Sequence, residues 1–374
     1  MGRLFEGNTS MVRQARTLYV LIRQKNGITR QALSEQMDLP ATSLNRMLER
    51  QVTAGLIEEY DLAESTGGRR PGLYRLNRQK RFLLGVDWRP QSGVMILADT
   101  SLEIIDQLGL AGFEGMSAEY QAAALIESAG ILLAKQHIDV AQILGLGLCV
   151  PESCLTGNTK PDWYMILEKQ AGTPVCLLQD DDAGFYAGLW QVREHAADSL
   201  LYLTIGQTVR CGMALNGQLH DNVLSIAPAE SLLVPLPDKS GQHELGQIVT
   251  IPALTRRFQR SKEDPGLGWG DFCQAVRDDK RKARQIIQDA AFAAAVAVHN
   301  MAVMTRSDHV LITGTALDDL PEYAHEIRAS SDQLERKTHI SPAIMTLKGG
   351  EDGRAAGAAS YVLETSLNAQ TSVL

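Results

Sequence analysis

Residues 29–55 of the chain read TRQALSEQMDLPATSLNRMLERQVTAG. Thr29 is a suitable cap for a short helix that ends at Asp38-Leu39-Pro40, because the residue before a proline avoids the helical region. A second helix follows at once, with an apolar stripe that starts at Leu44, and Gly55 ends it. Two short helices joined by a tight turn are typical of a helix-turn-helix, in which the second helix enters the major groove of DNA.

The polar residues of this stretch are candidates for DNA contact. Asn and Arg side chains match the hydrogen-bonding edges of purines, and several lie off the apolar stripe of the second helix. The candidates are Thr29, Arg30, Thr42, Ser43, Asn45, Arg46 and Arg50. A further helix from residue 12 to Asn26-Gly27 precedes them. The alternative is a three-helix scaffold with a solvated polar face.

The segment after these helices is typical of a wing. Residues 56–60 and 73–76 are strand-like, and the glycine-rich segment 64–72 between them reads ESTGGRRPG. A hairpin tip without bulky side chains can approach DNA closely, so Arg69 and Arg70 are candidates for phosphate or minor-groove contact. The alternative is a solvated turn.

The charge distribution agrees with an N-terminal DNA-binding module. Residues 1–81 carry 14 Lys and Arg against 8 Asp and Glu, whereas the rest of the chain carries 22 against 36. Because DNA binding depends on neutralising phosphates, the basic part can contact DNA and the acidic part would be repelled.

Composition excludes several other classes of protein. The chain has 374 residues, 44% of them apolar and 21% charged, which is ordinary for a folded protein of two or three domains. It has no uninterrupted run of 18 apolar residues and no signal-peptide segment at its start, so we expect a cytoplasmic protein without a membrane partner. The five cysteines contain no Cys-x-x-Cys pair, and we expect free thiols.

Beyond residue 81 the pattern predicts an α/β fold with two lobes and a cleft between them. We expect a winged helix-turn-helix domain at 1–81, one lobe at 82–195 and a second at 196–374, whose last helix returns to pack near the first lobe. The expected strands are 82–86, 93–98, 104–110, 143–150, 175–179, 200–205, 210–215, 309–313 and 343–347. The expected helices are 118–136, those around 243–260, 271–305 and 318–335, and one from about residue 352. Asn216-Gly217 predicts a hairpin turn.

Motifs in a characteristic order then identify a family. After the helix-turn-helix and the Gly-Arg-Arg-Pro of the wing come Leu-Leu-Gly-Val-Asp at 83–87, Gly-Leu-Gly-Leu-Cys-Val-Pro at 145–151 and Gln-Asp-Asp-Asp-Ala-Gly at 179–184. This order resembles the ROK family of repressors, open reading frames and kinases over essentially the whole chain. It is most similar to the branch that regulates xylose, glucose and N-acetylglucosamine genes. The resemblance implies an actin-like, sugar-kinase-like fold behind the DNA-binding module.

The phosphate-binding motifs of the family are degraded here. ROK kinases carry Asp-x-Gly-Gly-Thr after the first strand, where this chain has Asp87-Trp88-Arg89-Pro90-Gln91. The family's second glycine-rich loop corresponds to residues 206–212, GQTVRCG. Because backbone amides must approach a phosphate closely, these losses remove the cradle for ATP. We therefore expect no kinase activity and no catalytic residues.

The family's sugar and zinc motifs are also incomplete. Asp180 matches the aspartate that acts as general base in the kinases, and Glu230 matches the glutamate of Gly-Glu-x-Gly-His, whose histidine is missing. The zinc-binding cysteines are replaced by SGQHELGQ at 240–247, so we expect no metal and no cofactor. Candidate effector-binding residues are Asp180, Asp182, Glu230 and Arg210. For the three adjacent acids at 180–182 the alternative is a favourable charge at a helix N-terminus. Arg89 and Arg210 could receive an anion, and the alternative for them is pairing with nearby carboxylates.

These observations predict a sequence-specific transcriptional regulator, a repressor of carbohydrate-related genes that binds a two-fold operator on double-stranded DNA as a homodimer or dimer of dimers. An effector in the interlobe cleft would shift DNA affinity. A sugar or sugar derivative is the first candidate for the effector, and another metabolite is also open. The alternatives are a regulator controlled by protein partners and a sugar kinase that kept the N-terminal module.

Overall fold

The computed structural model describes residues 9–60, 72–151, 154–155, 160–194, 200–214, 227–236, 241–307, 309–338, 342–346 and 351–369. The chain forms two compact units. Unit 1 contains residues 1–190 and 351–374, and unit 2 contains residues 191–350.

The N-terminal part of unit 1 is a winged helix. Its helices are α1 (Thr9–Lys25), α2 (Arg30–Met37) and α3 (Ala41–Ala54), and its strands are β1 (Ile28–Thr29), β2 (Ile57–Tyr60) and β3 (Leu73–Leu76). The strands form an antiparallel sheet in the order β1-β3-β2. Left-handed backbone at Asp38 and Gly55 ends α2 and α3, as the sequence predicts. The short β1 was not predicted.

The first half of the remaining chain forms a five-stranded sheet in the order β6-β5-β4-β7-β8. β4 and β5 pair antiparallel, as do β5 and β6, whereas β7 lies parallel to both β4 and β8. The strands are β4 (Phe82–Trp88), β5 (Ser92–Asp99), β6 (Ile104–Ala111), β7 (Ile143–Val150) and β8 (Val175–Gln179). The helices are α4 (Ala118–Lys135), the 3-10 turn Val140–Gln142, α5 (Asp162–Gln170), α6 (Asp180–Glu194) and α13 (Glu351–Ala369).

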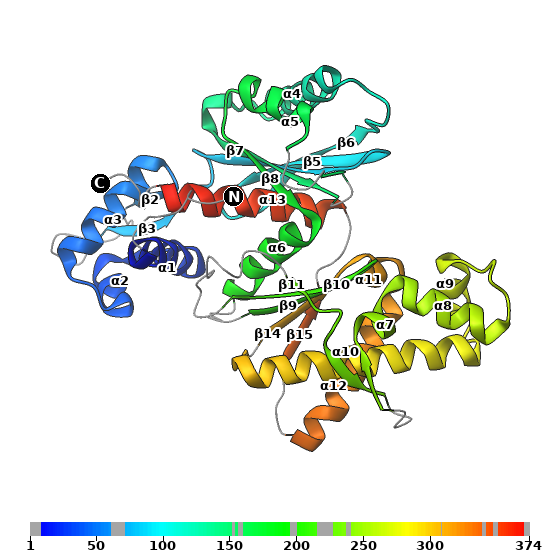
Figure 1. The fold of residues 1–374 in the computed structure, drawn as a ribbon. Coiled ribbons are helices and arrows are strands. Elements are labelled where there is room, and N and C mark those ends of the chain that lie inside the picture. Colours follow the sequence, from blue (N-terminus) through cyan, green and yellow to red (C-terminus); the bar gives the residue numbers. More distant parts are fainter. Residues whose placement is uncertain are drawn as a thin grey trace. The chain divides into compact units, whose positions relative to one another are not determined.

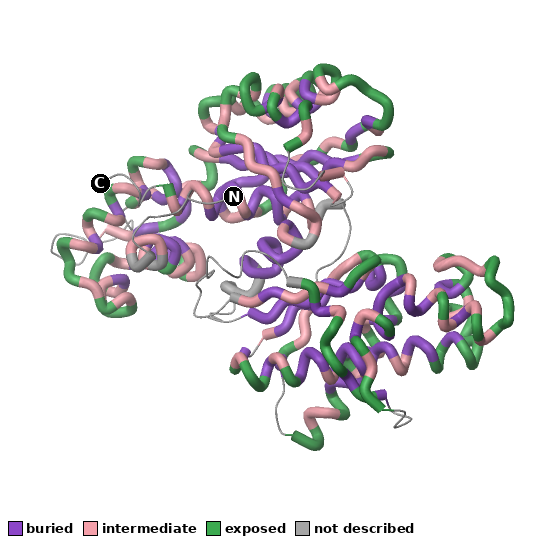
Figure 2. Tube along the Cα trace, in the orientation of Figure 1, coloured by how far each residue is buried: buried purple, intermediate pink, exposed green. Residues whose placement is uncertain are grey.

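Side chains that alternate along β4 build a core on each face of this sheet. Phe82, Leu84 and Val86 belong to the core that includes residues of α4 and α5, whereas Leu83 belongs to the core that includes residues of α13. In Figure 1 the red helix α13 runs along the sheet, and Figure 2 shows both as mostly buried.

The winged helix shares its core with the rest of unit 1. Tyr19 and Ile22 of α1 and Leu48 of α3 lie in one apolar cluster with Ala359 and Leu363 of α13. The contacts thus place the winged helix and the first lobe in one compact unit, although the charge and the pattern of helices and strands in the sequence change at residue 81. The division by function at residues 81 and 195 stays a prediction.

Unit 2 is built on a second five-stranded sheet in the order β11-β10-β9-β14-β15. Its strands are β9 (Leu200–Ile205), β10 (Val209–Ala214), β11 (Ala227–Pro228), β14 (His309–Thr313) and β15 (Ala343–Thr346), and β12 (Leu233–Pro235) pairs with β13 (Gln242–Glu244). Its helices are α7 (Gly246–Val249), α8 (Ile251–Lys262), α9 (Trp269–Arg277), α10 (Arg281–Thr305), α11 (Thr315–Asp319) and α12 (Pro321–Thr338). Among the described residues α10 alone has the length and apolar character to cross a membrane, but 67% of its most apolar window is buried in the protein.

Several boundaries in the α/β part differ from expectation. The helix expected at 271–305 is two helices, because Asp279 adopts left-handed backbone between α9 and α10. The helix expected at 318–335 is likewise α11 and α12, and the helical region around 243–260 contains β13, α7 and α8. Helix α5 and strands β11, β12 and β13 were not predicted. The Asn216-Gly217 turn lies outside the described residues.

Candidate DNA-binding surface and effector site

Helix α3 presents a polar face opposite its buried side. Leu44, Leu48 and Gln51 are buried, whereas Thr42 and Arg46 are exposed. The other three candidates on this helix, Ser43, Asn45 and Arg50, are partly exposed. Arg46 has neither a hydrogen bond nor an ion pair with any described residue, so its guanidinium group is available to an external partner.

Glu49 is an exposed residue of α3 that the sequence interpretation overlooked. It follows Thr42 and Arg46 at helical spacing, and a carboxylate on a reading helix can accept a hydrogen bond from the cytosine amino group. The spacing of three residues between Arg46 and Glu49 could have placed Glu49 on the same face of the helix. It was overlooked because the candidates for DNA contact were basic and neutral polar residues.

The two candidates at the start of α2 have structural contacts. The Thr29 hydroxyl accepts a hydrogen bond from the amide of Ala32 at 3.2 Å and caps the helix, as expected. The Arg30 guanidinium donates to the Tyr74 hydroxyl at 2.9 Å and lies 3.9 Å from the Glu59 carboxylate. Arg30 therefore connects α2 to the wing sheet. Arg69 and Arg70 lie outside the described residues.

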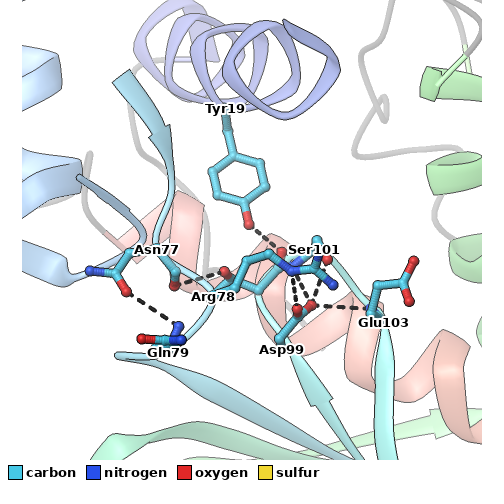
Figure 3. A network of polar contacts seen from close by, with 8 residues as sticks. Tyr19, Asn77, Arg78, Gln79, Asp99, Ser101 and Glu103 are labelled. Carbon is cyan, nitrogen blue, oxygen red and sulfur yellow. Dashed lines mark hydrogen bonds and ion pairs between the residues drawn. The ribbon is translucent and has the colours of Figure 1, made fainter. Parts of the chain in front are cut away.

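Polar contacts connect the winged helix to the first lobe (Figure 3). The Tyr19 hydroxyl of α1 donates to the carbonyl of Thr100, in the turn between β5 and β6. Asp99 holds this turn by accepting hydrogen bonds from the amides of Ser101 and Glu103, and it pairs with Arg78 of the segment before β4. The turn of the first lobe is thus ordered where α1 packs on it.

Arg81 makes a second connection. Its side chain donates to the carbonyl of Ala54 at the end of α3, at 3.0 Å, and to the carbonyl of Ala141, at 2.6 Å. Arg81, the last residue of the basic N-terminal part, therefore joins α3 to the first lobe.

A charged cluster lies at the end of β4, in the position of the family's first phosphate motif. Arg89 Nη1 and Nη2 donate to the two carboxylate oxygens of Asp180 at 2.8 and 3.0 Å, and its Nε donates to Asp87 at 2.9 Å. Arg354 of α13 donates to the second oxygen of Asp87, also at 2.9 Å. Cys149 of β7 lies 3.3 Å from Asp180. We call Asp87, Arg89, Cys149, Asp180 and Arg354 the arginine–aspartate cluster.

Burial determines the electrostatics of this cluster. The Asp87 side chain is fully buried, and desolvation raises its pKa although Arg354 and Arg89 act in the opposite direction. Desolvation and the nearby Asp180 and Asp87 carboxylates raise the pKa of the Cys149 thiol. The side chains of Asp180, Arg354 and Arg89 are 29%, 22% and 20% exposed, so these three residues form the solvent-accessible part of the cluster. Both carboxylate oxygens of Asp180 accept hydrogen bonds from Arg89.

Three aromatic rings belong to the core on the α4 and α5 side of the sheet. Trp88, the neighbour of Asp87, stacks on Phe113 with ring centroids 5.8 Å apart and on Trp163 at 5.2 Å. The sequence shows Asp87 and Arg89, but it does not show that Arg354, 267 positions away, meets Asp87.

The described residues offer little support for metal binding. Donor atoms of Asp87, Cys149 and Asp180 lie within 4.8 Å of one another, but Arg89 and Arg354 already neutralise the two carboxylates. In the region of the family's zinc motif, β13 carries only His243 and Glu244 as donors, and no cysteine lies in the described residues from 227 to 250. Four donors including thiolates or histidines are usual for structural zinc, so these residues do not fit it.

The remaining effector candidates belong to different units. Asp182 is partly exposed on α6 in unit 1, whereas Arg210 on β10 and Glu230 after β11 are partly exposed in unit 2. Their role in effector binding stays a prediction.

The fold has relatives among solved structures. A ROK family transcriptional regulator, a homolog of the E. coli MLC protein, aligns over 97% of this chain and 99% of its own, with a TM-score of 0.69 and 16% identity. This chain has the ROK fold. A ROK hexokinase from Thermus thermophilus also shares it, over 74% of this chain and 97% of its own, with a TM-score of 0.59 and 20% identity. The predicted fold class is therefore confirmed.

Sequence comparisons find relatives named as repressors, while no protein-family model matches. The xylose repressor of Caldicellulosiruptor bescii is 21% identical over 346 residues, 83% of this chain and 85% of the relative. A putative xylose repressor of Caldicellulosiruptor sp. strain Rt8B.4 is 25% identical over 57% of each chain. The xylose repressor of Bacillus subtilis is 22% identical over 54% of this chain and 55% of its own. The match thus spans only a little over half of the length of two of these relatives.

Proposed function

We propose that this ROK-fold protein is a sequence-specific DNA-binding repressor of carbohydrate-related genes, controlled by an effector that binds its kinase-like part. The observation that carries the proposal is the exposed polar face of α3, the second helix of a helix-turn-helix, in a chain that resembles xylose repressors. Its target is double-stranded operator DNA, bound as a homodimer or dimer of dimers in the cytoplasm.

The arginine–aspartate cluster argues against sugar phosphorylation. A general base must accept the proton of a substrate hydroxyl, but both oxygens of Asp180 accept hydrogen bonds from Arg89. Arg89 also stands where ROK kinases have a glycine turn for phosphate. We therefore propose a non-enzymatic role for this site.

Arg46→Ala is expected to weaken binding to the specific operator by about 1–3 kcal/mol, because it removes a guanidinium group that matches the edge of guanine. The operator can be selected in vitro from random DNA by the full-length protein, and the dissociation constant measured at one fixed salt concentration. The matched control is Arg336→Ala, an exposed arginine of α12 in unit 2, which should leave binding unchanged. Equal affinities for Arg46→Ala and the parent protein would show that α3 does not read DNA through Arg46.

Pentoses, hexoses and their phosphates are the first effectors to test. A sugar present at 100 times its dissociation constant should stabilise the protein by about 2.7 kcal/mol, which thermal unfolding detects. The same sugars with ATP should release no ADP. Stabilisation without turnover supports a sugar-controlled repressor, whereas turnover identifies a kinase. Absence of any shift favours control by a protein partner.

A further inference from the structure

Two helices begin at the arginine–aspartate cluster and reach α1 of the winged helix. At the start of α13, Arg354 donates to Asp87, and α6 begins at Asp180. Ten residues farther along each helix, Glu364 and Trp190 contact α1. At about 1.5 Å per residue, each helix covers about 15 Å between its two contacts.

The contact between α13 and α1 is a buried ion pair. Arg16 Nη2 of α1 lies 2.6 Å from the Glu364 carboxylate, and the two side chains are only 8% and 2% exposed. The same Arg16 nitrogen lies 3.5 Å from Asn368 Oδ1, one turn farther along α13. A buried charge must keep its partner, so a displacement of α13 has to move α1 or break this pair.

The neighbouring residue of α1 extends the connection to the reading helix. The carbonyl of Ala15 accepts a hydrogen bond from Gln51 Nε2 at 2.8 Å, and Gln51 is a buried residue of α3. Three polar contacts therefore connect Asp87 to α13, α13 to α1, and α1 to α3.

Helix α6 supplies a parallel connection. Trp190 packs edge-on against Tyr19 with ring centroids 5.9 Å apart, and the Arg23 guanidinium lies over the Trp190 ring at 5.4 Å. Tyr186 of α6 contacts Tyr361 of α13 with centroids 4.8 Å apart. The two helices thus contact each other as well as α1.

Helix α13 is closely packed against the sheet and against α6. Gly85 and Gly147 let the carbonyls of Ala355 and Ala358 approach the sheet, and a Cβ at either glycine would overlap them. On its other side, Gly357 meets the backbone of Ala183 in α6. Because these close contacts fix α13 against both the sheet and α6, we expect a displacement at Arg354 to involve α13 and α6 together.

We propose that Arg16 and Glu364 are positioning residues that couple the state of the arginine–aspartate cluster, through α13 and α1, to the operator affinity of α3. The proposal rests on the proposed repressor function and adds the route of its regulation. In the closed state the pairing of Arg89 with Asp180 holds both helices in the arrangement that binds DNA, and opening this pair releases DNA.

The test is a double-mutant cycle on operator affinity in the full-length protein, with DNA selected by the parent protein. Arg89→Ala opens the cluster and should weaken operator binding at least about fivefold, the usual lower bound for allosteric coupling. In a background carrying Arg16→Met and Glu364→Leu, which exchanges the ion pair for apolar packing, the same substitution should weaken binding by a smaller factor than in the parent, because of the connections described above only the contact of Trp190 with Tyr19 and Arg23 still links the cluster to α1. The matched control background carries Arg257→Met and Asp289→Leu, a partly buried 2.6 Å pair between α8 and α10, and should keep the full response.

Two results overturn the coupling proposal. The first is that Arg89→Ala lowers operator affinity by the same factor in the parent protein and in the Arg16→Met, Glu364→Leu background. The second is that Arg89→Ala does not lower operator affinity in the parent protein. Failure of the parent protein to select any DNA sequence would instead overturn the repressor function itself.

A second measurement does not depend on the folding of the apolar background. Hydrogen exchange of the parent and of Arg89→Ala should differ in α1, where the variant exchanges faster, and should agree in α8 of unit 2. Unchanged exchange in α1 would also overturn the coupling.

Discussion

Gly357→Ala is expected to lower the free energy of unfolding by about 3 kcal/mol, the upper end of the usual cost of overpacking, which is a large effect for one methyl group. A Cβ at this position would overlap the carbonyl oxygen of Ala183, so α13 and α6 must separate. Helix α13 cannot retreat toward the sheet, because Gly85 and Gly147 already meet its carbonyls there. Chemical denaturation of the full-length protein, followed in unit 1, measures the loss.

Gly130→Ala is the matched control. Gly130 also lies inside a helix, α4, but no neighbouring atom lies within 4 Å of the position that an added methyl group would take. Alanine is the better helix former, so this variant should gain about 1 kcal/mol. The same substitution should therefore have opposite signs at the two positions, and a gain at Gly357 would contradict the close packing of α13 on α6.

Glu364→Ala is expected to cost about 3–5 kcal/mol of unfolding free energy, because it leaves the Arg16 guanidinium buried without its charged partner. Replacing both residues by Met and Leu should be close to neutral, since no charge then remains buried. The control is Arg284→Ala, whose pair with Asp279 is exposed and should contribute at most about 1 kcal/mol. Similar losses for Glu364→Ala and Arg284→Ala would show that the buried pair does not stabilise the docking of α1.

The winged helix could be predicted closely because its signals are local. Capping at Thr29, the proline after Leu39 and the glycine at position 55 each act within a few residues. The break at Asp279 was missed because a non-glycine residue adopts left-handed backbone there. The break at Leu320 has a local signal that the expectation of one helix at 318–335 overlooked, because Leu320 precedes Pro321. The helical spacing of apolar residues continues across such positions and does not reveal the break.

The candidate site was predictable only in part. The resemblance indicates Asp180, and the absence of the family's glycines after Asp87 predicts that this segment does not bind phosphate. That Arg89 pairs with Asp180, 91 positions away, and that α13 brings Arg354 to the same place, depends on the assembled sheet. Charge patterning separated residues 1–81 from the rest, but it could not show that Arg81 and Tyr19 attach the winged helix to the first lobe.

The pairing of Arg89 with Asp180 also has a consequence for sensitivity. The Arg89 guanidinium group occupies the Asp180 carboxylate. If the effector binds through Asp180, it can bind only those molecules in which the Arg89–Asp180 pair is open. If the pair is closed in about 99% of molecules, the apparent dissociation constant is about 100 times the intrinsic one. A repressor built in this way ignores trace amounts of its metabolite and responds when the metabolite is abundant, and the strength of one ion pair sets that threshold.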